Sequence, residues 1–470
     1  MQDIMAILPL IATGAGAILI MLVAAFESFK KEGISILGIG LFAFAFFVQM
    51  TVENSSPITP YETIFNGMLV TSTLTKAAGL IILACGFFSA VAAQTYFTQN
   101  EGFIFEYYCM MLFAACGMIL MTMAAELITV FIALEIMSLA IYTLIGSDRK
   151  SVIRSEAVLK YLMLGAFAGA FFVMGSVFIY AGAKSTRFAD IAQVVSETGF
   201  LTNPALIVGS MLILVALLFK AAAFPFHAWV VDVYDGAPMP VTGFMATAVK
   251  TAVFAVFANF LLINTELREG WVTYLFWISV LTMFVGNLIA IGQNNLKRML
   301  AASGIVHSGY LIIGLVAMNS EIFSGGAVLF YLAAYAASTL GIFVALSYLG
   351  GEDEKRITFD DFNGLARIRP YSAACIAIFL LSMAGIPPTA GFMGKFYIIA
   401  GAFKQDYVAL GVLGIVSSIL SMWYYLRLII SMYFKEPEEE FVVSEMTLAP
   451  LGTFVLAVAV FAISFIPVAL

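Results

Sequence analysis

The sequence predicts an all-α, polytopic integral membrane protein with about fourteen transmembrane helices. Of its 470 residues, 62% are hydrophobic and only 11% are charged, whereas soluble globular proteins carry about 25% charged residues. The apolar residues form runs of about 20, the length that a spanning helix needs. Over such runs only a helix satisfies its own backbone hydrogen bonds in lipid. This composition excludes a soluble enzyme, and no basic patch suggests a nucleic-acid partner.

Short polar loops separate the fourteen apolar runs. The first run has no basic residue before it and spans about 20 residues, which favours a retained helix over a cleaved signal peptide. We expect spans near 5–27, 33–51, 74–98, 104–123, 125–146, 156–182, 205–233, 239–263, 271–292, 299–317, 323–349, 371–403, 406–434 and 447–466.

Lysine and arginine are distributed unevenly between the two sets of loops. With the N-terminus outside, the outer loops hold four basic residues and the inner loops hold twelve. Because cytoplasmic loops are enriched in Lys and Arg, both termini are expected on the outer side of a bacterial inner membrane. The twelve inner residues are Lys30, Lys31, Arg149, Lys150, Arg154, Lys297, Arg298, Lys355, Arg356, Arg367, Arg369 and Lys435.

The seventh and twelfth spans are too long and contain proline. Pro225 interrupts the seventh, and Pro387 and Pro388 interrupt the twelfth. Proline removes a backbone donor and clashes with the preceding turn, so both helices should break. Interrupted spans at matching places in two halves are typical of inverted-repeat transporters. Five spans separate the breaks, and an odd offset reverses the direction across the membrane.

The chain therefore divides into four predicted regions. Residues 1–100 hold three N-terminal spans, and residues 436–470 hold a loop and the last span. Between them, two inverted five-helix repeats comprise spans 4–8 (residues 101–265) and spans 9–13 (residues 266–435).

Glu135 and Lys160 are charged residues inside adjacent predicted spans. Counted from the intervening turn, they lie at similar depth, roughly 16 Å from the membrane face for Glu135, so they could form an ion pair. A structural ion pair without a role in turnover is the alternative for Glu135. For Lys160 the alternative is a lysine that reaches the interface, because Glu156 at position i−4 could hold it.

Lys220, Lys250 and Lys395 lie near the centres of the seventh, eighth and twelfth spans. A charge at that depth is costly and marks a functional site in most membrane proteins. Burial disfavours the charged form of a lysine and a nearby carboxylate favours it. A series of such lysines could therefore take up and release protons.

The chain has two histidines, His227 just after the first break and His307 in the tenth span. Imidazole titrates near neutrality and can relay protons, but a histidine inside the membrane can equally serve as a helix–helix hydrogen-bonding group. Asp232 and Asp235 lie at the inner end of the seventh span, where a structural or funnel role is favoured.

The sequence contains no motif for a resident redox cofactor. Its four cysteines lie in apolar runs without metal-binding spacing, and no dinucleotide fingerprint follows a strand. We therefore expect no cofactor and no metal in this chain.

Four segments resemble the antiporter-like membrane subunits of respiratory complex I, the proton-pumping NADH:quinone oxidoreductase. They are PFHAWVVDVYDGAPMPVTGFMATAVK, LEIMSLAIY, QNNLKRMLAASGIVHSGY and GIPPTAGFMGKFY. The resemblance extends over essentially the whole chain. The same superfamily includes subunits of multisubunit Na⁺/H⁺ antiporters and membrane-bound hydrogenases, which the motifs separate less well.

The resemblance implies a proton-translocating subunit coupled to NADH oxidation and quinone reduction in other subunits. NADH, FMN, iron–sulfur clusters and quinone are then expected in partner subunits, and the partners are further membrane subunits and the lipid bilayer. By resemblance, Glu135, Lys160, Lys220 and Lys250 match the proton-transfer residues of the first half. Lys395 matches the lysine of the second half.

Overall fold

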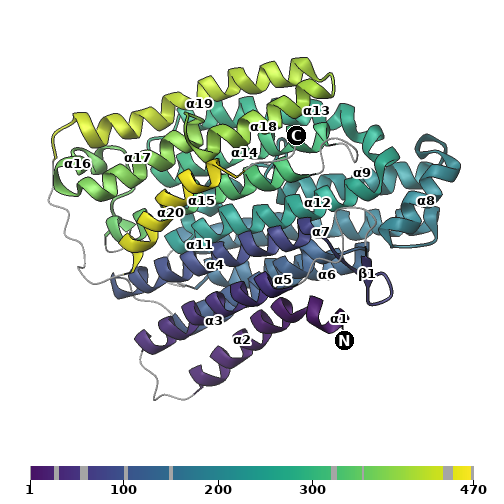
Figure 1. The fold of residues 1–470 in the computed structure, drawn as a ribbon, viewed down its shortest axis with the longest axis horizontal. Helices are drawn as coiled ribbons and strands as arrows, with labels where there is room; N and C mark the ends of the chain where they lie inside the picture. Colours follow the sequence, from purple (N-terminus) through teal and green to yellow (C-terminus); the bar gives the residue numbers. More distant parts are fainter. Residues whose placement is uncertain are drawn as a thin grey trace.

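The computed structural model describes residues 2–25, 31–52, 62–99, 104–147, 152–318, 325–351, 354–437 and 448–466. Lys30, Arg149 and Lys150 lie outside these ranges. The described chain is a bundle of long, roughly aligned helices (Figure 1). Its α-helices are α1 (Gln2–Ala6), α2 (Leu8–Ala24), α3 (Lys31–Thr51), α4 (Thr73–Gln99), α5 (Ile104–Met123), α6 (Leu127–Ile145), α7 (Val152–Ala183), α8 (Phe188–Thr198), α9 (Pro204–Lys220), α10 (Val230–Gly236), α11 (Met239–Phe244), α12 (Lys250–Ile263), α13 (Thr265–Ile291), α14 (Leu296–Ala317), α15 (Gly326–Leu349), α16 (Leu365–Ile368), α17 (Pro370–Ala384), α18 (Ala390–Lys404), α19 (Val408–Phe434) and α20 (Ala449–Ser464).

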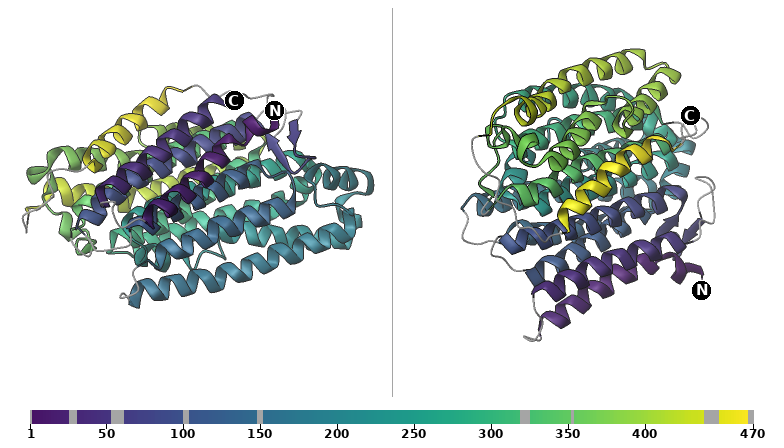
Figure 2. Two further views of the ribbon diagram at one scale, coloured as in Figure 1. Left: turned by 90° about the horizontal axis from the view of Figure 1, so that it is seen from below. Right: turned by 60° about the vertical axis from the view of Figure 1, so that its left-hand side comes forward.

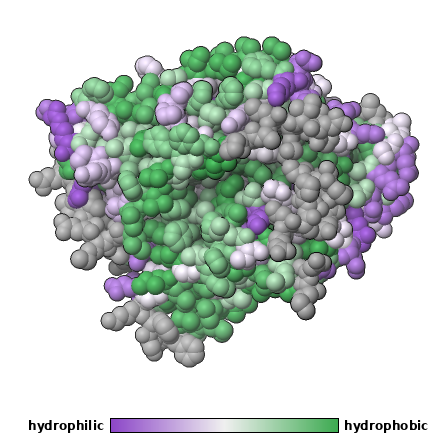
Figure 3. All heavy atoms as spheres, viewed as in Figure 1, coloured by the Kyte–Doolittle hydropathy of each residue, from purple (hydrophilic) through white to green (hydrophobic). Residues whose placement is uncertain are grey.

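Ten of these helices are long and apolar enough to cross a membrane, and four further apolar helices have 10–17 residues. The prediction of a helical, multi-pass membrane protein is confirmed. Figure 3 shows hydrophobic residues covering the middle of the molecule, with the most hydrophilic residues gathered mainly at its two ends. This is the distribution that a bilayer-spanning bundle requires.

The assignment to a purely α class is wrong in one detail. Strands β1 (Glu62–Ile64) and β2 (Leu69–Thr71) form an antiparallel hairpin before α4. Its turn places Phe65, Asn66 and Gly67 at positive φ. Glycine and asparagine tolerate this conformation, which a tight turn requires.

Both spans that the sequence predicted to break are interrupted. Helix α9 ends at Lys220 and α10 starts only at Val230, with Pro225 between them. Helix α17 ends at Ala384 and α18 starts at Ala390. We call the intervening segments, residues 221–229 and 385–389, the first break and the second break. Each contains a cis peptide bond before proline.

Helix α14 lies between the two breaks and is buried along its apolar length. It packs against α10, which follows the first break, and against α18, which follows the second. The two views in Figure 2 show the long helices of the bundle packed side by side along one common direction. The breaks are thus linked through one buried helix.

The bundle has a basic end, which we define as the end where α7 and α14 begin and where Arg154, Lys297 and Arg298 lie. Helix α16 lies at this end, on the left of Figure 1. The described chain ends lie toward the opposite side. A single π-helical turn, η2 (Met245–Val249), directly precedes Lys250; such turns occur frequently at functional sites.

Candidate functional site

Lys220 is the last residue of α9 and is 4% exposed. Its Nζ donates a hydrogen bond of 2.8 Å to the Ser138 hydroxyl of α6. Three aromatic rings surround the ammonium group, with centroids 5.8 Å (Tyr142), 5.2 Å (Tyr161) and 5.8 Å (Phe219) from Nζ. Aromatic faces attract a cation within about 6 Å. One hydroxyl and three rings therefore hold the Lys220 charge.

The expected pairing of Glu135 with Lys160 is wrong. Lys160 Nζ lies 2.7 Å from Glu156 and 2.8 Å from Asp232. The alternative left open by the sequence, in which Glu156 holds Lys160, is confirmed. Glu135 instead faces Gly169 of α7, where an added Cβ would lie 3.2 Å from its Oε1.

The reason for this error is an overhang of α7 at the basic end. A Cβ at Gly146, at the end of α6, would lie 3.2 Å from a Val158 side-chain carbon. Six residues of α7 therefore extend beyond α6, roughly 9 Å at 1.5 Å per residue. Lys160 is close to the level of Gly146, whereas Gly169, beside Glu135, is nine residues further along α7.

Glu135 is instead near Lys220. A Cβ at Gly165 of α7 would lie 3.8 Å from Lys220 Nζ. Gly165 and Gly169 are one helical turn apart, so the two charged groups occupy successive levels of the same helix. Lys160, Lys220 and Glu135 thus follow one another along α7 from the basic end inward.

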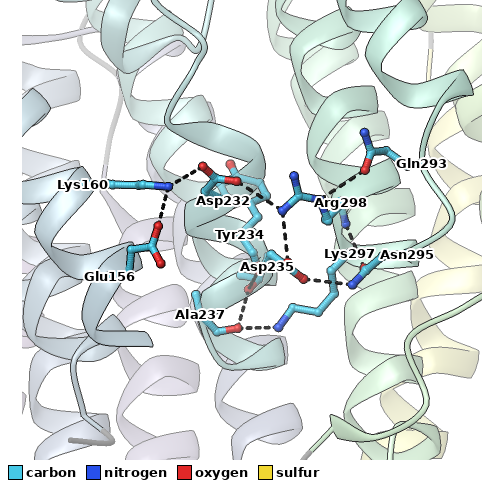
Figure 4. Close-up of polar contacts among 11 residues, drawn as sticks. Glu156, Lys160, Asp232, Tyr234, Asp235, Ala237, Gln293, Asn295, Lys297 and Arg298 are labelled. Atoms are coloured by element: carbon cyan, nitrogen blue, oxygen red, sulfur yellow. Dashed lines mark hydrogen bonds and ion pairs between the residues drawn. The ribbon is translucent and has the colours of Figure 1, made fainter. Parts of the chain in front are cut away.

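A cluster of ion pairs occupies the basic end (Figure 4). Asp232 of α10 accepts from Lys160 at 2.8 Å and from Arg298 at 3.2 Å, and Arg298 also contacts Asp235 at 3.2 Å. The neighbouring Lys297 donates to the Ala237 carbonyl at 2.7 Å. The two aspartates expected near the inner end of the seventh span therefore connect α10 to α7 and α14.

Ser308 of α14 connects the first break to Lys250. Its hydroxyl lies 2.5 Å from the Ala221 carbonyl, next to Lys220, and 3.2 Å from the Gly304 carbonyl. Lys250 Nζ also donates to the Gly304 carbonyl. Lys250 is 4% exposed, and the Tyr335 ring centroid lies 4.9 Å from its Nζ.

His307 lies next to Ser308 on α14 and is 4% exposed. Its Nδ1 is 2.7 Å from the Tyr331 hydroxyl and its Nε2 is 3.2 Å from the Tyr425 hydroxyl. Each ring nitrogen thus has a partner that can donate or accept a proton. This geometry suits a relay, and it equally suits the hydrogen-bonding role that the sequence left open.

Lys395 lies six residues into α18, beside the second break, and is 5% exposed. Its Nζ donates to the carbonyls of Met383 at 2.9 Å and Ala384 at 3.0 Å, and to the Ser418 hydroxyl at 2.9 Å. Carbonyls in the last turn of a helix lack intrahelical donors and carry partial negative charge. The end of α17, exposed by the break in the twelfth span, therefore supplies two of the three ligands of Lys395.

A cavity of about 10 Å³ lies between His307 and the second break. Tyr331, Tyr335, Ser338 and Ser382 supply polar atoms to its wall. A space of this size with several polar neighbours can hold about one water molecule. Such a water would bridge the His307 cluster to the Met383 side of the break, where Lys395 binds.

His227 does not join this arrangement. It lies within the first break, half-buried, with its ring 5.5 Å from that of Phe224. Its Nδ1 is buried without a hydrogen-bond partner among the described residues. The structure thus brings Lys220, Lys250, His307 and Lys395 together around α14 and leaves His227 apart.

Sequence reasoning missed the hydroxyl groups that connect the charged residues. They are Ser138, Ser308, Tyr331, Tyr425, Ser382 and Ser418. Serine and tyrosine are ordinary residues of transmembrane helices, so their presence is no signal. Their position in the sequence could have identified two of them as candidates, because Ser308 directly follows His307 and Ser382 lies shortly before Pro387 and Pro388.

Comparison with known proteins gives a consistent result. Residues 124–421 match the sequence family described as NADH:quinone oxidoreductase/Mrp antiporter, TM. NADH-quinone oxidoreductase subunit N of Trichlorobacter lovleyi is 41% identical over 363 residues, covering 77% of this chain and 74% of the relative.

Two solved structures share the fold. A chain of respiratory complex I from Thermus thermophilus with bound aureothin gives a TM-score of 0.82 at 29% identity, covering 97% of each chain. A chain of the Mrp complex from Dietzia sp. gives a TM-score of 0.79 at 19% identity, covering 98% of this chain and 93% of the other. At that identity the second likeness is one of fold alone.

Proposed function

Because this chain belongs to the family of subunit N of NADH-quinone oxidoreductase, we propose that it moves protons across the membrane while other subunits oxidise NADH and reduce quinone. The NADH, FMN, iron–sulfur clusters and quinone then belong to those partners. One observation carries the proposal. Buried lysines beside the two helix breaks converge on a single buried helix, α14, through hydroxyl and carbonyl groups.

The proton would be taken up from the basic end onto Lys220. It then passes by way of Ser308 to Lys250. Ser308 contacts the Ala221 carbonyl next to Lys220, and both Ser308 and Lys250 donate to the Gly304 carbonyl. His307 and the cavity beyond it lead to Lys395, from which the proton leaves on the opposite side. Each transfer protonates one basic nitrogen and deprotonates the one before it. Glu135 acts on Lys220 by its charge, which favours the protonated lysine.

The fourteen-span arrangement, with both termini outside a bacterial inner membrane, belongs to the same proposal. Ten long apolar helices and four shorter ones, two of which (α9 and α17) begin the interrupted spans, support it. The excess of lysine and arginine in the loops of the basic end supports an inward orientation of that end. The division into residues 1–100, 101–265, 266–435 and 436–470 is supported by the two similar breaks five spans apart.

The test is proton pumping by the assembled complex in membrane vesicles. Lys220→Ala and Lys395→Ala are each expected to abolish most proton uptake per NADH oxidised, because no neighbouring amine can replace the missing one. Lys404→Ala is the matched control, since Lys404 is exposed on the same helix as Lys395. Wild-type pumping by intact Lys220→Ala and Lys395→Ala complexes would refute the relay.

A subunit of a Na⁺/H⁺ antiporter or of a membrane-bound hydrogenase is the alternative that the sequence left open. The subunits that purify with this chain discriminate between them. Redox subunits that bind NADH support the proposed function, and an assembly without them contradicts it.

A further inference from the structure

Two stacked aromatic side chains lie between Lys220 and the ion-pair cluster of the basic end. The rings of Tyr161 and Trp229 are 4.5 Å apart and inclined by 18°. The Tyr161 ring faces Lys220 Nζ at 5.2 Å, and Trp229 Nε1 donates to the Phe219 carbonyl at 3.3 Å. Tyr161 is 1% exposed and Trp229 is 4% exposed. The pair thus covers Lys220 on one side.

The position of this pair along α7 identifies the side that it covers. Lys220 lies beside Gly165, and Tyr161 is one helical turn nearer to the basic end. Lys160 and Glu156 follow in the same direction. A proton that travels from the basic end to Lys220 along α7 therefore meets the two rings first. Stacked, buried rings exclude the water that would carry it.

An ion pair ties together the two segments that carry the rings. Lys160 adjoins Tyr161 on α7, and Asp232 is three residues after Trp229, on the same face of the turn that starts α10. Lys160 and Asp232 are 2.8 Å apart, as Figure 4 shows. Closing this pair draws α10 against α7 and so holds the rings together.

The Lys160–Asp232 ion pair is also able to open. Lys160 and Asp232 side chains are 40% and 38% exposed, and half-exposed ion pairs are weak. Each partner has a second contact of opposite charge, Glu156 for Lys160 and Arg298 for Asp232. Separation therefore leaves neither charge unpaired. Helix α10 has seven residues and follows the non-helical first break, so it can move without disturbing α9.

We propose that Tyr161 and Trp229 form a gate that controls proton access from the basic end to Lys220, and that the Lys160–Asp232 ion pair is its latch. This proposal rests on the proposed function, in which Lys220 carries a proton. With the latch closed, the basic end is cut off from Lys220, and its proton can move only toward Ser308 and Lys250. With the latch open, Lys220 is loaded from the basic end.

The test measures access to position 220 directly and does not depend on pumping. Lys220→Cys is introduced into the complete complex, and inside-out vesicles are treated with a small cationic methanethiosulfonate, with labelling of this chain followed by mass spectrometry. Adding Asp232→Asn is expected to raise the labelling rate about fivefold, since it removes an ion pair of modest strength. Trp229→Ala should raise the rate further because it removes half of the gate.

Three further variants separate a latch from general loosening of the fold. Lys160→Gln breaks the same pair from α7 and should raise the rate as Asp232→Asn does. Asp232→Glu keeps the charge and should restore the parent rate. Glu156→Gln removes the other salt bridge of Lys160 and should leave the rate unchanged.

The outcomes are distinguishable from those of the pumping test. Labelling at the parent rate in Asp232→Asn and Lys160→Gln complexes overturns the gate, whatever Lys220→Ala does to pumping. An equal rise with Glu156→Gln also overturns it, because the effect would then not depend on the Lys160–Asp232 pair. Faster labelling together with normal pumping by Lys220→Ala supports the gate and refutes the relay.

Discussion

Lys220 precedes the first break and Lys395 follows the second, and their surroundings differ accordingly. Lys220 has one hydroxyl acceptor and an aromatic enclosure. Lys395 has two carbonyls from the end of α17 and one hydroxyl. A backbone carbonyl at a helix end has a fixed position and can only accept, so it binds the ammonium form of a lysine without having to rotate. The second break therefore holds a charge with fixed backbone dipoles, whereas the first depends on side chains that can move.

The two breaks also differ in the residues at equivalent positions beside them. Lys220 is five residues before Pro225, and the residue five before Pro388 is Met383. The Met383 carbonyl accepts a hydrogen bond from Lys395. Lys395 is seven residues after Pro388, where the first break has Asp232. At this equivalent position the first break is thus followed by an acid, Asp232, and the second break by an amine, Lys395. This difference agrees with the proposal that protons are loaded at the first break and released at the second.

The largest effect is expected from Gly391→Ala at the second break. The new Cβ would lie 1.9 Å from the Ser382 carbonyl oxygen, a backbone atom that cannot rotate away. Overpacking of this kind costs on the order of 1–3 kcal/mol or more. We expect a several-fold loss of the chain from the assembled complex, measured by native gel and immunoblot.

Gly165→Ala provides the comparison at the Lys220 site. There the Cβ would lie 2.1 Å from the Tyr142 hydroxyl, the tip of a side chain that can shift. Assembly should be near normal and pumping slower. If both substitutions left assembly intact, the idea that the second break is the more rigid one would be wrong.

Removing the serine hydroxyl that binds each lysine should affect pumping differently at the two sites. Ser138→Ala takes away the hydroxyl that accepts from Lys220, whereas Ser418→Ala leaves Lys395 with two carbonyls. A hydrogen bond to a charged group contributes about 1.5 kcal/mol at the lower end of its usual range, which is roughly tenfold in rate. The NADH-driven pumping rate should fall about tenfold with Ser138→Ala and less than about threefold with Ser418→Ala.

Ser347→Ala is the control for this pair, because its hydroxyl bonds only within its own helix, to the Val344 carbonyl. It should pump normally. Equal losses with Ser138→Ala and Ser418→Ala would contradict the contrast between side-chain and backbone ligands.

A smaller effect is expected at the connection between the breaks. Tyr331→Phe removes the partner of His307 Nδ1 and one polar group of the cavity wall. A net hydrogen bond contributes about 0.5–1.5 kcal/mol, so pumping should fall about fivefold. Tyr425→Phe, at the longer contact of 3.2 Å, should cost less.

Tyr348 lies on the same helix as Tyr331, but its hydroxyl donates to Ser372 and not to a member of the His307 cluster, so Tyr348→Phe is the control. Its pumping rate should match the wild type. A normal rate for Tyr331→Phe would mean that His307 serves as a structural hydrogen-bonding group, and the connection to Lys395 would then need another route.

The sequence alone determined the long apolar helices, the two breaks and the burial of Lys220, Lys250 and Lys395, but not the short helix α8. These follow from local facts, because an apolar run of sufficient length must form a helix in lipid and proline interrupts it. The β1–β2 hairpin escaped prediction because its strands of three residues are too short to show an alternating pattern, although Asn66 and Gly67 in its turn are typical of hairpins.

Only the tertiary structure decided which charges meet. Depth counted along the chain placed Glu135 opposite Lys160, but the overhang of α7 moves Lys160 to the basic end and brings Glu135 near Lys220. The hydroxyls and carbonyls that link the lysines were equally hidden, since they come from helices far apart in sequence. Periodicity fixes where a residue lies along its own helix, whereas the relative sliding of helices depends on how their small residues pack.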